Sequence, residues 1–211
     1  FLSRLYARED KWLTVHATGA GTGLVADIQS VKDSSKTFLG ANITYHRKLS
    51  HKFLAPYFPN PGNWFVCRKM TQSFAYAGFR NIQNTFYLDE DDVSEQGLAS
   101  ISISGNVDST EPRPEGRDFQ VWISLFDGQQ YYSCNIIFPK NDKGMSVLGR
   151  DVENALSRFH ALKMIFKHFE IGELALDDFS FHQRPTGLSK KEQNSLSIKF
   201  FQSHPEVEEV S

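Results

Sequence analysis

Alternation of apolar and polar residues marks two neighbouring segments in the middle of the chain. Residues 119–126 read FQVWISLF and residues 129–138 read QQYYSCNIIF, with Asp127 and Gly128 between them. Asp-Gly is a pair favoured in two-residue hairpin turns, where both central residues need positive φ. The pattern therefore predicts a β-hairpin with this pair at its tip.

A two-residue loop determines which residues of the hairpin face one another, because side chains along a strand alternate with a period of two. The predicted pairs on the mostly apolar face are Leu125 with Gln130, Ile123 with Tyr132, Val121 with Cys134, and Phe119 with Ile136. The predicted pairs on the opposite face are Ser124 with Tyr131, Trp122 with Ser133, and Gln120 with Asn135. We expect the apolar face to cover a hydrophobic core.

A helical period replaces the period of two after the hairpin. Between Val152 and Phe169, apolar residues recur at spacings that place them on one face of a helix. Asp151 is a suitable N-cap for this helix, and Gly172 is a suitable residue to end it. A helix with so apolar a face needs a sheet to cover it, and the apolar face of the hairpin is the nearest candidate.

Shorter alternating segments predict further strands. We expect them at residues 12–17, 40–49, 79–88, 99–107 and 195–201. Residues 79–88 are expected to pair with residues 99–107 across the acidic turn DEDDVSEQG. The segment LVADIQSV, residues 24–31, is short and rich in β-branched residues, so we expect it to be a poor helix former.

These elements predict an α+β protein: mainly an antiparallel sheet, with one principal amphipathic helix packed on it. Residues 108–118 contain two prolines and a glycine and no apolar residue, which is typical of a linker. We therefore divide the chain into a strand-rich N-terminal half, residues 1–107, and a C-terminal hairpin–helix half, residues 119–211. This division is also compatible with one compact domain.

The charge balance makes nucleic acid an unlikely partner. Lys and Arg number 23 and Asp and Glu number 25, so the formal charge is -2 and no global positive field exists. A minor alternative is nucleic-acid binding by the cluster TYHRKLSHKF, which contains Tyr45, Arg47, Lys48, His51 and Lys52. No apolar run approaches the roughly 20 residues that span a bilayer. We expect a cytoplasmic protein without a membrane span.

The residues that commonly hold metals lack the required spacing. Cys67 and Cys134 are too few for a four-cysteine zinc site, and we expect buried free thiols, although a single bridge between them stays open. The acidic run that starts at Asp89 has Ser94 and Ser100 where a calcium loop needs glycine and glutamate. H-E-x-x-H and G-x-S-x-G are both absent, so we predict no metal, no cofactor and no catalytic residue.

Three glycines at alternate positions lie in the stretch HATGAGTGLVADI, which starts at His16. A phosphate-binding loop would need a G-x-G-x-x-G or P-loop pattern leading into a helix, and neither pattern is present. A bend that uses glycine's tolerance of positive φ is the favoured interpretation. The alternative is a small-molecule or nucleotide-binding enzyme whose ligand loop is formed by His16, Gly19, Gly21, Gly23 and Asp27.

The segment from residue 119 to residue 170 resembles a small family of bacterial immunity-like domains whose genes accompany toxin systems. Members show a strand, a strand that contains a cysteine, and then the motif G-x-D-x-x-x-A-L at the start of a helix. The matching residues in this chain are Cys134, Gly149, Asp151, Ala155 and Leu156. The resemblance implies a binding role without catalysis.

The second face of the predicted hairpin is the candidate contact surface, because aromatic residues among polar neighbours are typical of protein interfaces. We therefore predict a non-catalytic protein-binding module, immunity-like or part of an assembly, that binds another protein or its own copies. Its candidate partner-binding residues are Gln120, Trp122, Ser124, Tyr131 and Asn135. The alternative is that the N-terminal half covers this face and buries both rings, since the chain has 18 Phe, seven Tyr and three Trp to bury.

Overall fold

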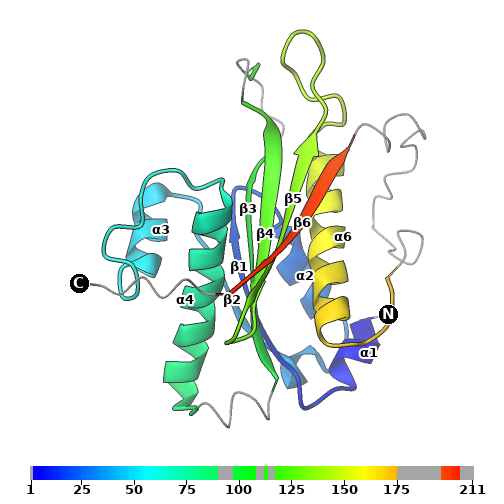
Figure 1. The fold of residues 1–211 in the computed structure, drawn as a ribbon. Coiled ribbons are helices and arrows are strands. Elements are labelled where there is room, and N and C mark those ends of the chain that lie inside the picture. The colour runs from blue at the N-terminus through cyan, green and yellow to red at the C-terminus, as the bar shows by residue number, and fades with distance from the viewer. Residues whose placement is uncertain (1, 90–96, 108–111, 114–116, 175–195, 205–211) are drawn as a thin grey trace.

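The computed structural model of the 211-residue chain describes residues 2–89, 97–107, 112–113, 117–174 and 196–204. A six-stranded sheet in the order β2-β1-β3-β4-β5-β6 forms its centre (Figure 1). The strands are β1 Trp12–Thr18, β2 Phe38–Ile43, β3 Leu98–Asn106, β4 Phe119–Phe126, β5 Tyr131–Phe138 and β6 Ser197–Ser203. β1 is parallel to β2 and to β3, whereas the β3–β4, β4–β5 and β5–β6 pairs are antiparallel. The predicted α+β class is confirmed, with a mixed and mostly antiparallel sheet.

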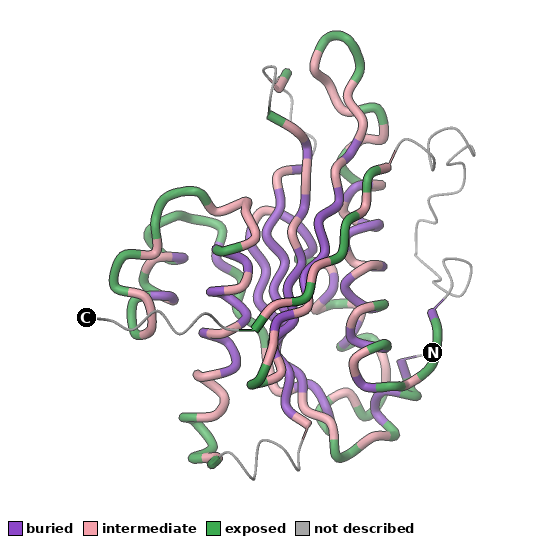
Figure 2. The backbone as a smooth tube through the Cα atoms, in the orientation of Figure 1, coloured by how far each residue is buried: buried purple, intermediate pink, exposed green. Residues whose placement is uncertain are grey.

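Helices cover both faces of this sheet, which makes three layers (Figure 1). The helices on one face are α1 Leu2–Tyr6, α2 Gly23–Gln29 and α6 Arg150–His168, and those on the other face are α3 Arg47–Leu54 and α4 Arg68–Phe86. A single principal helix is not confirmed, because α4 and α6 each have 19 residues. The central strands are buried between these layers (Figure 2). No helix in the described part of the chain is long and apolar enough to cross a bilayer.

The predicted packing of the last long helix on the hairpin is confirmed. The apolar hairpin residues Val121, Ile123 and Ile136 share one buried cluster with Leu156 and Phe166 of α6. α6 begins at Arg150 after an N-cap, Gly149, that makes no side-chain hydrogen bond, so the expectation that Asp151 caps the helix is wrong. The helix also ends before Gly172, because the chain leaves it through Phe169 and Glu170, the latter at φ 53°.

The hairpin is confirmed, but its predicted register is wrong by two residues. Ile123 faces Cys134 rather than Tyr132, and residues 127–130 form a four-residue connection. The cause is the Asp127 carboxylate, whose Oδ1 accepts hydrogen bonds from the backbone N–H of Gln129 at 2.9 Å and of Gln130 at 2.8 Å. A shift of two residues leaves each side chain on its predicted face, since the period of a strand is two.

The expectation of a strand at residues 79–88 is wrong, because these residues lie in α4 up to Phe86. Met70, Phe74 and Ala77 are buried at helical spacing, and polar residues between them obscure that period in the sequence. Gly78 lets this helix lie close to the sheet, since a Cβ at Gly78 would be 2.6 Å from Ser100 Oγ of β3. The buried face of α4 therefore combines apolar side chains with close backbone contact.

The remaining expectations have mixed outcomes. The strands expected at 12–17, 99–107 and 195–201 are confirmed as β1, β3 and β6, whereas 40–49 is part strand and part helix. The expectation that residues 24–31 are poor helix formers is wrong, since α2 covers most of them. One sheet combines strands from both predicted halves, and the division at 108–118 stays a prediction. Most of that linker, and the acidic run after Asp89, lie outside the described residues.

The carboxylate in the hairpin connection gives a first prediction. Replacing Asp127 with Ala removes both acceptor contacts, and we expect a loss of about 1 kcal/mol in the free energy of unfolding. Asp127→Asn keeps an oxygen acceptor of the same shape and should retain most of that stability. Urea denaturation of the two variants checks this, and an equal loss in both would show that the acceptor contacts do not stabilise the connection.

Candidate functional site

The order of the first three strands creates a crevice at one end of the sheet. β1 lies between β2 and β3 and is parallel to both. The connection from β1 to β2 passes through α2 on the α6 face, whereas the connection from β2 to β3 passes through α3 and α4 on the opposite face. In open sheets, ligands bind beyond the carboxyl ends of parallel strands where the strand order reverses. The carboxyl ends of β1 and β3 are therefore the place to look for a site.

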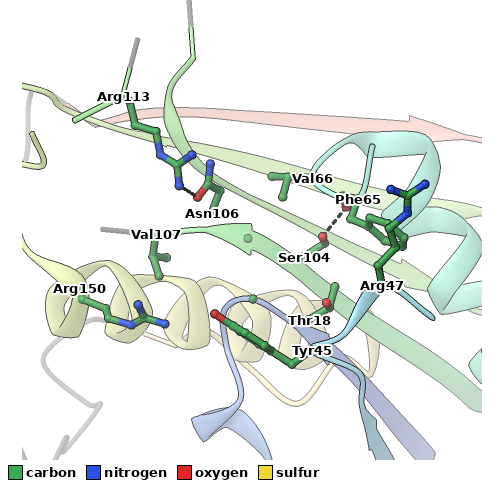
Figure 3. A pocket seen from close by; sticks show the side chains of 12 residues that line it. Thr18, Tyr45, Arg47, Phe65, Val66, Ser104, Asn106, Val107, Arg113 and Arg150 are labelled. Atoms are coloured by element: carbon green, nitrogen blue, oxygen red, sulfur yellow. Dashed lines mark hydrogen bonds between the residues drawn. The ribbon is translucent and has the colours of Figure 1, made fainter. Parts of the chain in front are cut away.

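A pocket of about 350 Å³ lies at this point (Figure 3). The end of β1 supplies Thr18 and Gly19, and the end of β3 supplies the segment 104–107. The connection from β2 into α3 supplies Tyr45 and Arg47. The other lining residues are Phe65, Val66, Arg113 and Arg150. Segments that are far apart in the sequence thus meet around one cavity.

The charged residues that line the pocket are all basic. Its twelve lining residues include Arg47, Arg113 and Arg150, and none of these twelve is acidic. Arg47 donates a hydrogen bond to Oδ1 of Asn63, and Arg113 donates one to Oδ1 of Asn106. The side chains of Tyr45 and Arg150 point toward one another across the cavity in Figure 3. Arginine suits the recognition of phosphate and carboxylate groups, because its planar guanidinium can donate two parallel hydrogen bonds.

Hydroxyl groups and aromatic rings form the rest of the surface. Ser104 is fully buried and its Oγ donates a hydrogen bond to the backbone carbonyl of Phe65, which ties β3 to the segment before α4. Thr18 is 7% exposed, whereas Tyr45 is 74% exposed at the rim. These groups offer hydrogen-bond donors and acceptors beside the three guanidinium groups. Val66 and Val107 add apolar contact.

The candidate ligand loop is only partly at the pocket. Gly19 lines it, and its φ of 74° together with a very close approach to β3 requires glycine there. A Cβ on Gly19 would lie 2.1 Å from the carbonyl oxygen of Gly105. Gly21 and Gly23 are turned toward α6 instead. The N–H of Gly21 donates to Asn154 Oδ1 at 3.3 Å, and a Cβ on Gly23 would meet Arg158.

The other two members of that loop are structural. The Asp27 carboxylate of α2 forms an ion pair with Arg158 of α6, with 3.3 Å between the charged atoms. His16 is 1% exposed and stacks on Phe74, with 4.1 Å between the ring centroids. His16 Nε2 lies 3.1 Å from Thr44 Oγ1, so the ring supports the chain segment that leads to Tyr45. Burial lowers the pKa of His16 to about 3.

The five residues predicted to bind a partner lie on the face covered by α4 and beside β6. Ser124 is buried, Tyr131 is 8% exposed, and both lie beneath or beside α4. Asn135 is 5% exposed, while Gln120 and Trp122 are half-buried. The Trp122 ring is 5.6 Å from the ring of Phe201 on β6. None of the five lines the pocket.

The sequence offered a signal for only part of the pocket. The basic and aromatic cluster at residues 44–53 includes Tyr45 and Arg47, both of which line it. Arg113 lies in the segment interpreted as a linker, and Arg150 directly precedes the predicted helix cap. Neither position has a local pattern that indicates binding. A long-range contact ties Arg113 to the segment that leads into α6, since its backbone N–H donates to the Gly144 carbonyl at 2.8 Å.

The expectations about cysteines and metals concern residues outside the pocket. Cys134 is buried and Cys67 is half-buried, and both are free. Burial raises the pKa of the Cys134 thiol to about 12, so it is not an activated nucleophile. Within the described ranges, no group of three or more His, Cys, Asp or Glu residues is placed to hold a metal ion.

Fold and site together define a mixed-sheet domain with an arginine-lined pocket at a strand switch point. Among solved structures, the fold is shared by a competence-damaged protein (CinA) superfamily protein from Escherichia coli, which is 18% identical, with a TM-score of 0.55 over 77% of this chain and 83% of that chain. The competence damage-inducible protein A (ComA) from Klebsiella pneumoniae is 16% identical, with a TM-score of 0.57 over 80% and 94% of the two chains. The competence/damage inducible protein CihA from Agrobacterium tumefaciens is 12% identical, with a TM-score of 0.56 over 80% and 95%. No protein-family model matches the chain, and a comparison with curated protein sequences finds no match.

These comparisons overturn two expectations. The resemblance of residues 119–170 to immunity-like domains is wrong, because the structures that share this fold across most of the chain belong to the CinA superfamily. The predicted non-catalytic protein-binding function is wrong as well, because it was drawn partly from that resemblance. At these identities the likeness shows the fold alone, so function has to be argued from the pocket.

Glycine at position 19 is the basis of a second prediction. Gly19→Ala would place a Cβ against the Gly105 carbonyl at positive φ, and we expect a loss of about 2–4 kcal/mol from strain and overpacking together. Gly62 is the matched control, since its φ is 75° and nothing lies within 4 Å of its added Cβ. Gly62→Ala should therefore cost only about 1 kcal/mol. Urea denaturation measures the free energy of unfolding of both variants. Similar losses in Gly19→Ala and Gly62→Ala would contradict the close contact between Gly19 and the Gly105 carbonyl.

The buried imidazole gives a third prediction, on pH. The pKa of His16 is lowered from 6.5 to about 3, so the unfolded chain takes up a proton below pH 6.5 that the folded chain does not. Stability is therefore lost as the pH falls through this window, by roughly 1.4 kcal/mol per pH unit for one proton. His16→Gln removes this contribution and should flatten the fall measured by urea denaturation between pH 6.5 and 5. His160, whose pKa is lowered to about 4, leaves a residual slope in both proteins. An unchanged slope in the variant would exclude His16 as a source.

Proposed function

We propose that this chain binds a small phosphorylated molecule, nucleotides included, in the pocket beyond β1 and β3, and that it is an enzyme acting on that molecule. One observation carries the proposal: three arginines and no acidic residue line a cavity at the switch point of the sheet. Guanidinium groups grouped in a cavity whose other lining residues are all uncharged favour an anionic ligand, because one such ligand can pair with them by charge-assisted, bidentate hydrogen bonds.

The dimensions and the lining support a small molecule rather than a polymer. A cavity of about 350 Å³ falls within the range of small-molecule sites. The rings of Tyr45 and Phe65 and the side chain of Val107 provide apolar surface for the uncharged part of such a ligand. The site therefore combines the charge that recognises phosphate with surface that suits an organic body.

The same groups support a reaction in which the anionic group of the ligand is transferred to an acceptor such as water. Fixed guanidinium groups stabilise negative charge as it develops in a transition state, and they need no rearrangement to do so. Tyr45, Thr18 and Ser104 are the hydroxyl groups of the lining. Tyr45 is the accessible one of the three, which places its hydroxyl group where it can exchange a proton with the ligand.

A fourth prediction tests the binding step with matched pairs of ligands. AMP and ribose 5-phosphate should raise the melting temperature, because a ligand of the native state stabilises it, whereas adenosine and ribose should not. Arg150→Gln should weaken phosphate binding roughly tenfold to a hundredfold, as expected for the loss of a charge-assisted contact. Lys163→Gln is the control, since Lys163 is an exposed residue of α6 that does not line the pocket. Equal shifts by AMP and adenosine would contradict the assignment to phosphate.

Turnover is measured separately. Incubation of the chain with the phosphorylated compounds that bind, followed by ³¹P NMR, should show a new phosphorus signal that Arg150→Gln slows. Binding without conversion of any such compound would leave a binding protein and contradict the enzymatic part of the proposal.

A further inference from the structure

We infer that the ligand of this pocket carries two anionic groups on one body, one bound by Arg47 and the other by Arg113. This inference rests on the proposed function and narrows its ligand class from phosphorylated molecules in general to bis-anionic ones. Figure 3 shows the two guanidinium groups on opposite walls, with Val66 and Ser104 between them. A ligand that reaches both must therefore span the cavity.

Each of the two arginines is oriented by an asparagine. The guanidinium of Arg47 donates to Oδ1 of Asn63, and that of Arg113 donates to Oδ1 of Asn106 at the end of β3. An amide oxygen fixes the direction of a guanidinium group without neutralising it, whereas a carboxylate at the same place would remove the net charge. Among the described residues, the structure thus orients two guanidinium groups, of the exposed Arg47 and the half-buried Arg113, and pairs neither with a carboxylate.

The ion pairs of the chain agree with this. In the ranges that the structure describes, no ion pair includes Arg47 or Arg113. By contrast, Arg158, which holds α2 against α6, is paired with the carboxylate of Asp27. Arg47 and Arg113 differ from Arg158 in this respect, because their described side-chain partners are amide oxygens rather than a carboxylate.

One donor atom of Arg113 makes no hydrogen bond to the described residues. Its Nε is buried and has no hydrogen-bond partner among the described residues. Its guanidinium carbon lies 5.4 Å from the centre of the Phe119 ring, so the side chain is held on an apolar surface rather than in water. A buried donor without a partner is unfavourable, so the Arg113 guanidinium is short of hydrogen-bond acceptors among the described residues.

Two like charges in one cavity also favour a ligand that compensates both. A single anionic group bound at one wall pairs with the guanidinium of that wall. Two groups joined by one body compensate both, and the second contact is strengthened by the first because it becomes intramolecular. Sugar bisphosphates, diphosphate-linked nucleotides and molecules that combine phosphate with carboxylate share this chemistry.

A ladder of synthetic probes tests the inference on the full chain. Alkane-α,ω-bisphosphonates with one to six methylene groups, and alkylphosphonates of matching length, are titrated by calorimetry. We expect one spacer length to bind at least tenfold more tightly than its monophosphonate, with weaker binding at shorter and longer spacers. A maximum at a single length measures the separation of the two anion sites.

Four variants assign the two ends of the best probe. Arg47→Gln and Arg113→Gln should each lower the affinity for the bisphosphonate to that of the monophosphonate. Asn63→Asp and Asn106→Asp keep the size of the side chain and add a carboxylate, so each should cause the same loss by neutralising its arginine. Arg80→Gln is the control, since Arg80 contacts Tyr76 and Gln83 of α4 and does not line the pocket. If Asn106→Asp lowers the affinity for the bisphosphonate as much as Arg113→Gln does, and the melting temperature is unchanged, then the loss comes from the neutralised charge and not from a disturbed fold.

The outcomes are distinct. If bisphosphonates of every length bind no more tightly than monophosphonates, the inference is wrong and the proposed function stands. If both arginine substitutions weaken the monophosphonate as much as the bisphosphonate, the two arginines hold one anionic group and the inference is again wrong. If no phosphonate and no phosphorylated compound binds, the proposed function fails and the inference fails with it.

Discussion

The contact between Gly19 and Gly105 is the constraint on which the pocket depends. A side chain on Gly19 would collide with the Gly105 carbonyl, and a Cβ on Gly105 would lie 2.3 Å from Ala20 Cβ. Because both residues lack side chains, the loop after β1 can lie against the end of β3. Asn154 and Arg158 of α6 then hold that loop and the following α2 from the other side. These contacts place the start of α6, and Arg150 with it, beside the carboxyl ends of the parallel strands.

The two faces of the sheet are built differently, and the difference explains how the pocket is closed. The α6 face is apolar, whereas hydroxyl groups line much of the α4 face. Ser102 Oγ donates to the backbone carbonyl of Thr71 at 2.5 Å, and Gln72 Nε2 donates to Ser133 Oγ at 3.2 Å. Buried hydroxyl groups need such partners, so they fix the position of α4 on the sheet more specifically than apolar contact would. Ser104 continues this row to the pocket, where its bond to Phe65 closes one wall.

Sequence patterns predicted the elements whose causes are local and failed where the cause is long-range. Alternation and turn chemistry identified the hairpin, and helical spacing identified α6 and the face on which it packs. The register failed because the Asp127 side chain closes a wider connection than the Asp-Gly pair alone implies. α4 was missed because its buried face contains serine, threonine and glycine, which dilute the apolar period. The pocket could not be predicted, because it exists only where a parallel pairing of β1 with β3 joins segments some 90 residues apart.

The overall charge of the chain does not argue against the proposed ligand, for a related reason. A formal charge of -2 argues against a polyanionic partner, whose affinity depends on a field over a wide surface. It does not argue against a small anion, because the field inside a cavity is set by the few charges in its walls and is screened least there. The pocket concentrates three guanidinium groups within a chain that is otherwise slightly acidic. Attraction of the proposed ligand from a distance would therefore be weak, and its affinity would come from direct contacts with the arginines that the asparagines orient.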